Sequence, residues 1–179
     1  MGRDQSAEDS SESGHRTSSA SDQSGSSPGE QRGPDDDTAP GALTDTYAAA
    51  IQHDLVDLEP ETTLIGVVRQ PPPWFHAAVE ENVRELGPPS SLLEETKTAE
   101  EELKMQGLCA EGAHNAAWEQ VDFVSRYRTH LETDADAQDA LTRLRERLES
   151  GESIALVCFE NTNKKCCHRT VLREVLEGE

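Results

Sequence analysis

The chain has 179 residues, of which 36 are acidic and 16 are basic, and its formal net charge at pH 7 is -20. This excess of carboxylates repels polyanions, which excludes a surface that binds nucleic acid or anionic membranes in general. No stretch has the apolar length of a membrane span or a signal-peptide core, so we expect a cytoplasmic protein without a membrane partner.

Residues 1–40 have the composition of a disordered tail. They contain ten serines, five glycines and three prolines but no aromatic residue. Such a segment buries too little apolar surface to offset the entropy of ordering it. The tail carries a charge of -6, so residues 41–179, which we predict to be a single α/β domain, carry -14.

Arginine is also much more frequent than lysine, since twelve of the basic residues are arginine and four are lysine. Many carboxylates combined with few lysines resemble the proteins of salt-accumulating halophilic archaea. Molar salt screens the self-repulsion of such a surface. We therefore expect a halophilic archaeal protein, and the alternative is an ordinary acidic cytosolic protein.

Three segments are candidates for strands. Residues 63–69 and 153–159 are short, apolar and partly β-branched, which predicts strands buried on both faces of a parallel sheet. Residues 44–52 are compatible with a first strand, although their alanines suit a strand poorly. Cys158 lies inside the last of these segments and is read as a small core residue.

Apolar residues at helical spacing predict five helices, and Ser90 or Ser91 is a candidate cap for the second. A loop is expected at residues 107–115. The predicted helices cover residues 75–86, 91–105, 118–131, 137–148 and 171–176. Together with the strands they predict an α/β fold, a small parallel-sheet layer with flanking helices preceded by the disordered tail.

Polar residues follow the two main strands. The carboxyl ends of parallel strands share one sheet edge, where open α/β folds bind ligands. That edge would collect Arg69 and Glu160, followed by the start of the last helix at Cys167 and His168. Residues 161–173 contain no acidic residue and four basic ones: Lys164, Lys165, Arg169 and Arg173.

A positive helix start favours a bound anion and lowers the pKa of a nearby thiol. We therefore predict an anion-binding site formed by Arg69, Lys164 and Arg169. Cys167 would be a nucleophile or redox-active thiol, with His168 and Glu160 as proton-transfer groups. The alternative is purely structural: the lysines belong to a solvated loop, Cys167 packs under the helix, and the arginines pair with acids.

Two other motif interpretations are weaker. Cys167 and Arg173 have the Cys-x5-Arg spacing of a phosphate-binding loop, but the residues between them include no glycine and have a helical pattern. Cys109 and His114 together with Cys166, Cys167 and His168 would supply soft ligands for zinc, but without the usual Cys-x2-Cys spacing. We predict neither a metal nor a cofactor.

The ordered motifs resemble those of the family called domain of unknown function 488. The segment Val157-Cys158-Phe159-Glu160 followed by Cys167-His168-Arg169 resembles its C-terminal signature, and Arg69-x-x-Pro72 and Arg126-Tyr127 resemble two earlier motifs. The resemblance spans residues 44–177 and implies a small α/β domain with polar residues on one edge. The family commonly has an aspartate two residues before the motif arginine, where this chain has Val67.

Two functions follow from these features. The first is a small enzyme or sensor with an anion-binding, thiol-based site for a phosphorylated small molecule or nucleotide. The second, disfavoured by the acidic surface, is a non-enzymatic module that recognises a nucleic-acid end or a damaged base.

Overall fold

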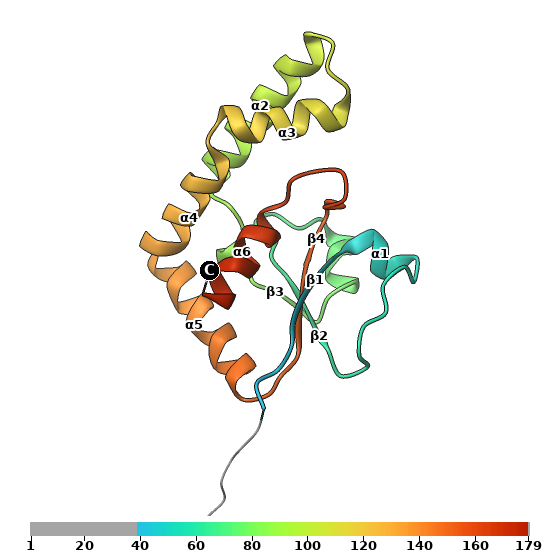
Figure 1. Cartoon of the computed structure of the whole chain (residues 1–179), viewed down its shortest axis with the longest axis vertical. Coiled ribbons are helices and arrows are strands. Elements are labelled where there is room, and N and C mark those ends of the chain that lie inside the picture. The colour runs from blue at the N-terminus through green and yellow to red at the C-terminus, as the bar shows by residue number, and fades with distance from the viewer. Residues whose placement is uncertain (1–38, 179) are drawn as a thin grey trace, which may run out of the picture. The chain divides into compact units, whose positions relative to one another are not determined.

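The computed structural model describes residues 39–178, so the predicted tail at residues 1–40 lies almost wholly outside the described part of the chain. Four strands form one parallel sheet in the order β1-β4-β2-β3. The arrangement confirms the predicted α/β class and its parallel sheet (Figure 1). The strands are β1 (Leu43–Tyr47), β2 (Thr63–Gly66), β3 (Glu81–Asn82) and β4 (Ile154–Cys158).

Strand β4 occupies the centre of the sheet. Ala155 pairs with Thr44 of β1 on one side and with Leu64 of β2 on the other. All five residues of β4 are buried. A parallel strand with neighbours on both edges and cover on both faces needs apolar side chains at successive positions, which explains the uninterrupted apolar run.

Within residues 39–178, six α-helices accompany the sheet. In Figure 1, α4, α5 and α6 lie on one side of the sheet and α1 on the other, while α2 and α3 form a hairpin beyond the carboxyl ends of the strands. No helix within residues 39–178 is long and apolar enough to cross a membrane. The helices are α1 (Ala48–Gln52), α2 (Ser90–Met105), α3 (Ala110–Gln120), α4 (Phe123–Thr133), α5 (Ala135–Glu149) and α6 (His168–Glu177).

The prediction of a helix at residues 75–86 is wrong. This segment forms a 3-10 helix, Pro73–Ala77, then β3, and then a second 3-10 helix, Arg84–Leu86. Its backbone bonds partly within the two 3-10 turns and partly to β2, because the amide of Glu80 donates to the Leu64 carbonyl and that of Val83 to the Gly66 carbonyl. The apolar spacing is helical, but pairing with the sheet edge satisfies the backbone equally well and buries the same side chains.

The other boundaries differ in three places. The strand predicted at residues 63–69 ends at Gly66 in β2, so Arg69 lies beyond it. Only the first part of residues 44–52 is a strand, and the alanine-rich remainder is α1, in keeping with the helix propensity of alanine. The single helix predicted at residues 118–131 is two helices, α3 and α4, and α3 begins inside the expected loop. They are separated at Asp122, whose φ of 52° is left-handed and ends the helical hydrogen bonding.

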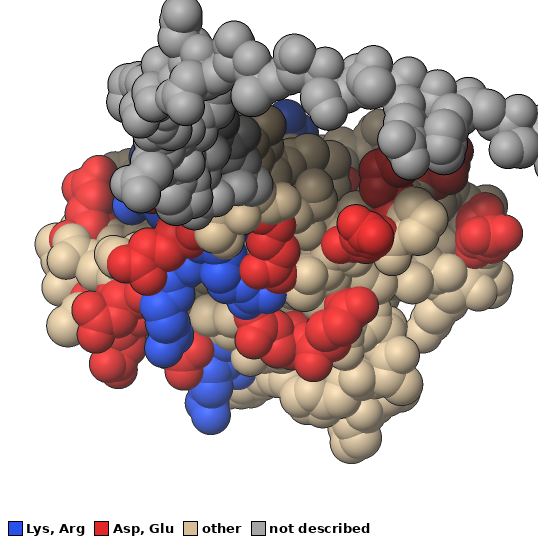
Figure 2. Space-filling model, turned by 90° about the horizontal axis from the view of Figure 1, so that it is seen from below, with Lys and Arg blue, Asp and Glu red and all other residues tan. Residues whose placement is uncertain are grey.

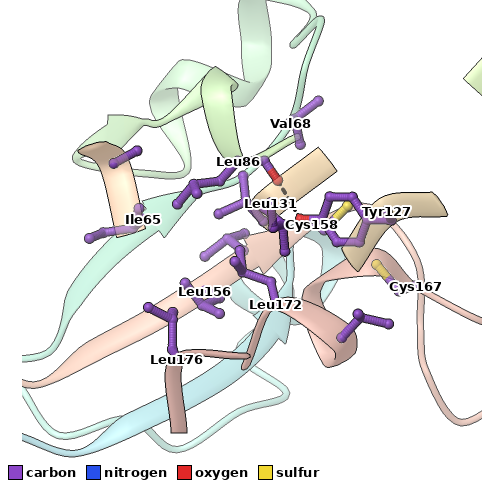
Figure 3. Close-up of a cluster of buried hydrophobic side chains, with 14 of the residues drawn as sticks. Ile65, Val68, Leu86, Tyr127, Leu131, Leu156, Cys158, Cys167, Leu172 and Leu176 are labelled. Atoms are coloured by element: carbon purple, nitrogen blue, oxygen red, sulfur yellow. Dashed lines mark hydrogen bonds between the residues drawn. The ribbon is translucent and has the colours of Figure 1, made fainter. Parts of the chain in front are cut away.

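The core between β4, α4 and α6 is closely packed (Figure 3). Leu156, Leu172 and Leu131 are at most 1% exposed, and the buried Tyr127 hydroxyl donates a hydrogen bond to the Leu86 carbonyl at 2.5 Å. Burying each aliphatic side chain of this size contributes about 1.5–3 kcal/mol. The sulfur atoms of two cysteines lie at one end of this cluster, beside the Tyr127 ring.

Candidate functional site

Two thiols and an imidazole meet where β4 ends and α6 begins. Cys158 is the last residue of β4, Cys167 precedes α6, and His168 is its first residue. The two Sγ atoms and a ring nitrogen of His168 all lie within 4.8 Å of one another, and the three residues are between 4% and 8% exposed. The Nδ1 atom of His168 lies 3.8 Å from Cys158 Sγ and 4.0 Å from Cys167 Sγ.

The imidazole of His168 is held in one orientation. Its Nε2 atom lies 2.7 Å from the Val67 carbonyl oxygen. A carbonyl only accepts hydrogen bonds, so in the neutral ring Nε2 carries the hydrogen and Nδ1 presents its lone pair to the two thiols. The ring also packs edge-on against Tyr127, with the centroids 5.6 Å apart. His168 is therefore positioned as a proton acceptor for either cysteine.

The two thiols have different acidities. The pKa of Cys158 is lowered mainly by a hydrogen bond from the Cys167 thiol, with burial opposing this and the Phe159 amide and the Arg169 charge adding to it. The pKa of Cys167 is raised because its hydrogen is donated to Cys158 and because it is buried. Of the pair, Cys158 is the thiol whose pKa is lowered.

Cys158 was predicted to be a small core residue and not a site residue, because it lies within an apolar strand. Its signal was its place at the carboxyl end of the central parallel strand, the edge where such sheets bind ligands. The side chain belongs to the core and faces the site at the same time. It lines the same pocket as Cys167 and His168.

Arg169 supports the loop that carries the thiols. Its side chain is almost completely buried, and Nε donates to Asp45 of β1 at 2.7 Å. Nη1 donates to the Glu160 carbonyl at 2.7 Å, and Nη2 to the Thr162 hydroxyl at 3.2 Å. These bonds tie residues 160–169 to the edge strand and keep a positive charge close to Cys167, whose Sγ lies 4.0 Å from Nη1.

The positive charge predicted for residues 161–173 is largely compensated. Lys165 lies 3.4 Å from a Glu160 carboxylate oxygen, and Arg173 pairs with Asp45 at 3.2 Å and with Glu177 at 3.0 Å. Arg169 is paired as described. The side chain of Lys164 is exposed and lines a different hollow from the one that the thiols line.

A pocket of about 300 Å³ opens beside the thiols, between the sheet edge and the hairpin of α2 and α3. Four of the six predicted site residues line it together with Cys158: Arg69, Glu160, Cys167 and His168. Lys164 and Arg169 do not. Its walls are mostly apolar and include Val68, Leu93, Trp118 and Phe159.

Arg69 is partly engaged by the backbone around this pocket. Its Nε donates to the Pro88 carbonyl at 3.1 Å and its Nη2 to the Gly87 carbonyl at 2.5 Å. Nη2 also lies 3.1 Å from Nε2 of His130. The guanidinium is thereby fixed at the pocket wall.

Helix α3 clamps the loop before α6. Nε2 of His114 lies 2.9 Å from the Cys166 carbonyl oxygen, Oδ1 of Asn115 accepts from the Cys166 amide at 2.9 Å, and Nδ2 of Asn115 donates to the Lys164 carbonyl at 3.0 Å. Neither residue was predicted to act here. Polar side chains in a helix give no sign of a distant loop that they hold.

The zinc ligand set considered from the sequence is not assembled. Cys109 is exposed, its sulfur accepts the Gly112 amide at the start of α3, and His114 is engaged by the loop carbonyl. Within residues 39–178, the residues whose spacing could hold a soft metal ion are Cys158, Cys167 and His168.

Comparison with known proteins gives one match. A family model described as "Active DUF488-N3 subclade" (DUF488-N3a) matches residues 51–179, which include every residue of the pocket. The match confirms the expected resemblance to the domain of unknown function 488 family. No curated protein and no solved structure matches the chain. Because the family model matches most of its length, the chain belongs to the DUF488-N3a family.

Proposed function

We propose that the protein is a thiol-dependent enzyme in which Cys158 attacks an electrophilic small molecule bound in the pocket. One observation carries the proposal: Cys158 Sγ faces, at 3.8 Å, a histidine nitrogen whose partner nitrogen is fixed by the Val67 carbonyl. A nucleophile beside a base that a third group orients is the usual arrangement of covalent catalysis. The description of the family as an active subclade is in keeping with this proposal.

The roles divide among few residues. Cys158 is the nucleophile, His168 accepts or returns a proton at Nδ1, and Cys167 stabilises the Cys158 thiolate by donating its S–H. Arg69 and Glu160 line the same pocket. An anionic substrate, such as a phosphorylated metabolite or a nucleotide, would place its charge beside Arg69, and Glu160 is the second candidate for proton transfer.

Alkylation tests the proposal. In a Cys109→Ser/Cys166→Ser variant the two exposed thiols are gone, and iodoacetamide is added to the folded protein across a pH series. We expect Cys158 to be modified first, at a pH below that of an ordinary cysteine, because its pKa is lowered. Peptide mapping by mass spectrometry measures the site and the rate. Equal rates at both cysteines, or reaction only after unfolding, would refute the proposal.

A matched pair of variants separates the hydrogen bond from packing. Cys167→Ala removes the S–H donor, whereas Cys167→Ser keeps a donor of similar size. A hydrogen bond to a charged group contributes about 1.5–3 kcal/mol, so the alanine variant should react at Cys158 roughly tenfold or more slowly at pH 7. The serine variant should stay near the parent rate.

Protection by phosphate tests the proposed anion binding separately. If an anion binds beside Arg69, phosphate should slow alkylation of Cys158, and Arg69→Gln should abolish that protection. Alkylation that proceeds equally fast with phosphate would remove the anionic substrate from the proposal while leaving the nucleophile in place.

A further inference from the structure

We infer that Cys158 and Cys167 form a redox-active dithiol that reduces small disulfides and closes into an intramolecular disulfide. The inference rests on the proposed function, in which Cys158 is the nucleophile, and it assigns Cys167 as the thiol that resolves the covalent intermediate. It also names the substrate class, a low-molecular-weight disulfide.

The geometry brings these two sulfur atoms together with His168, whereas Cys166 lies at the exposed rim of the same pocket. Cys158 and Cys167 come from the end of a strand and the start of a helix, with their Sγ atoms within 4.8 Å. A disulfide needs about 2.05 Å between the sulfur atoms, so closing it requires the two side chains to move toward each other. Cys109 is exposed and accepts a hydrogen bond at the start of α3, and the neighbouring Cys166 is exposed as well.

The pocket gives a small disulfide access to the pair. Both thiols are 4% exposed, so a protein disulfide cannot reach them, yet both line the pocket of about 300 Å³. Its apolar walls at Val68 and Phe159 suit a compact, uncharged sulfur–sulfur group.

The exchange balances in two steps. The Cys158 thiolate attacks one sulfur of the substrate R–S–S–R, forming a Cys158–S–R bond while R–S⁻ leaves and takes up a proton. Cys167 then gives its hydrogen to Nδ1 of His168, and its thiolate attacks Cys158 Sγ. The second R–S⁻ leaves and takes the proton from His168. Two electrons pass from the dithiol to the substrate, and a small dithiol reverses the reaction.

The experiment uses the full chain with Cys109→Ser and Cys166→Ser. Glutathione disulfide is added to the folded protein, the reaction is quenched with acid, and free thiols are blocked with N-ethylmaleimide. We expect the intact mass to show loss of two hydrogen atoms and peptide mapping to show a Cys158–Cys167 cross-link, both reversed by dithiothreitol. In a Cys167→Ser variant the reaction should stop at one glutathione adduct on Cys158.

His168→Gln provides a second readout, since it leaves both thiols but removes the proton acceptor. Cross-linking should slow by roughly a hundredfold while the circular dichroism spectrum stays native. A parent protein that stops at the adduct, or cross-links only when unfolded, would overturn the inference, as would a tightly bound metal ion on both sulfur atoms. Selective alkylation of Cys158 without any cross-link would overturn the dithiol alone, whereas an inert Cys158 would refute the proposed function as well.

Discussion

At the scale of single residues, the site depends on pairs in which one group determines the tautomer or the pKa of its neighbour. The Val67 carbonyl selects the tautomer of His168, and the Cys167 thiol lowers the pKa of Cys158. The same principle operates away from the site. Glu152 accepts two hydrogen bonds from Arg147, at 2.6 and 2.8 Å, and one from the Thr63 hydroxyl at 2.7 Å.

These bonds predict an acid-sensitive contribution to stability. Hydrogen bonds from Arg147, and then from Thr63, lower the pKa of Glu152 from 4.5 to about 2. Because the folded pKa is the lower one, the stabilisation is present above pH 4.5 and is lost as the pH falls toward 2. Glu152→Gln should therefore lower the free energy of unfolding at pH 7 by about 0.5–1 kcal/mol, a value limited by the partial exposure of the pair.

Thermal melts of the parent and the variant from pH 7 to pH 2 measure this contribution. The two Tm curves should converge as the pH falls through that window. Glu149→Gln is the matched control, since it removes the same charge from an exposed position at the end of α5, three residues away, and should not lower Tm. Parallel curves for Glu152→Gln across the whole range would show that the pKa of Glu152 is not depressed.

At the scale of elements, the sheet edge depends on close packing under the pocket. The Asn82 side chain accepts from the Val68 amide at 3.1 Å and donates to its carbonyl at 2.9 Å, so it extends the pairing of β2 with β3. Gly66 lies beneath this contact. A Cβ atom there would lie 2.6 Å from Asn82 Oδ1 and 2.6 Å from a ring carbon of Phe75.

Two glycine substitutions should consequently have opposite effects. Gly66→Ala overpacks a site whose neighbours are held in place, and should reduce the free energy of unfolding by about 1–3 kcal/mol. Gly112→Ala lies in helix α3, where a Cβ meets only Cys109 Sγ at 3.3 Å, and should stabilise by up to about 1 kcal/mol. Urea unfolding midpoints measure both, and a Gly66→Ala protein as stable as the parent would contradict the packing argument.

At the scale of the whole molecule, charge is the dominant property. Acidic side chains are spread over the face drawn in Figure 2, with basic side chains interspersed among them. In the described ion pairs, such as Arg126 with Glu95, basic side chains are paired with nearby carboxylates. They cannot compensate a chain with a net charge of -20, so folding brings many uncompensated carboxylates together.

We therefore expect added salt to stabilise the folded protein. Raising KCl from about 0.1 M to about 1 M shortens the screening length from about 10 Å to about 3 Å, which weakens long-range repulsion more than close ion pairs. Tm should rise by several degrees in KCl and equally in NaCl, as expected also for a halophilic protein. A Tm that falls with salt would mean that the ion pairs outweigh the repulsion.

How far the sequence leads can be seen in particular segments. The run of apolar residues at 153–159 predicts β4 because a central parallel strand tolerates few other sequences, and the spacing at 137–148 predicts α5 because it buries one face of a helix. The helix prediction for residues 75–86 is wrong because the spacing of apolar residues along the chain carries no information about the backbone partners that β2 provides. Helix and strand bury the same side chains there, and only the neighbouring strand decides between them.

The sequence by itself determined the parallel α/β class, the family motifs, the acidic surface and four residues of the pocket, since each depends on composition or on neighbours along the chain. The tertiary structure decided which of the two thiols has the lowered pKa. Cys158 and Cys167 interact because β4 ends where α6 begins, and Arg169 and Arg173 near them pair with Asp45, which comes from β1. Such effects depend on distances between segments far apart in the chain, and the folded core sets these distances.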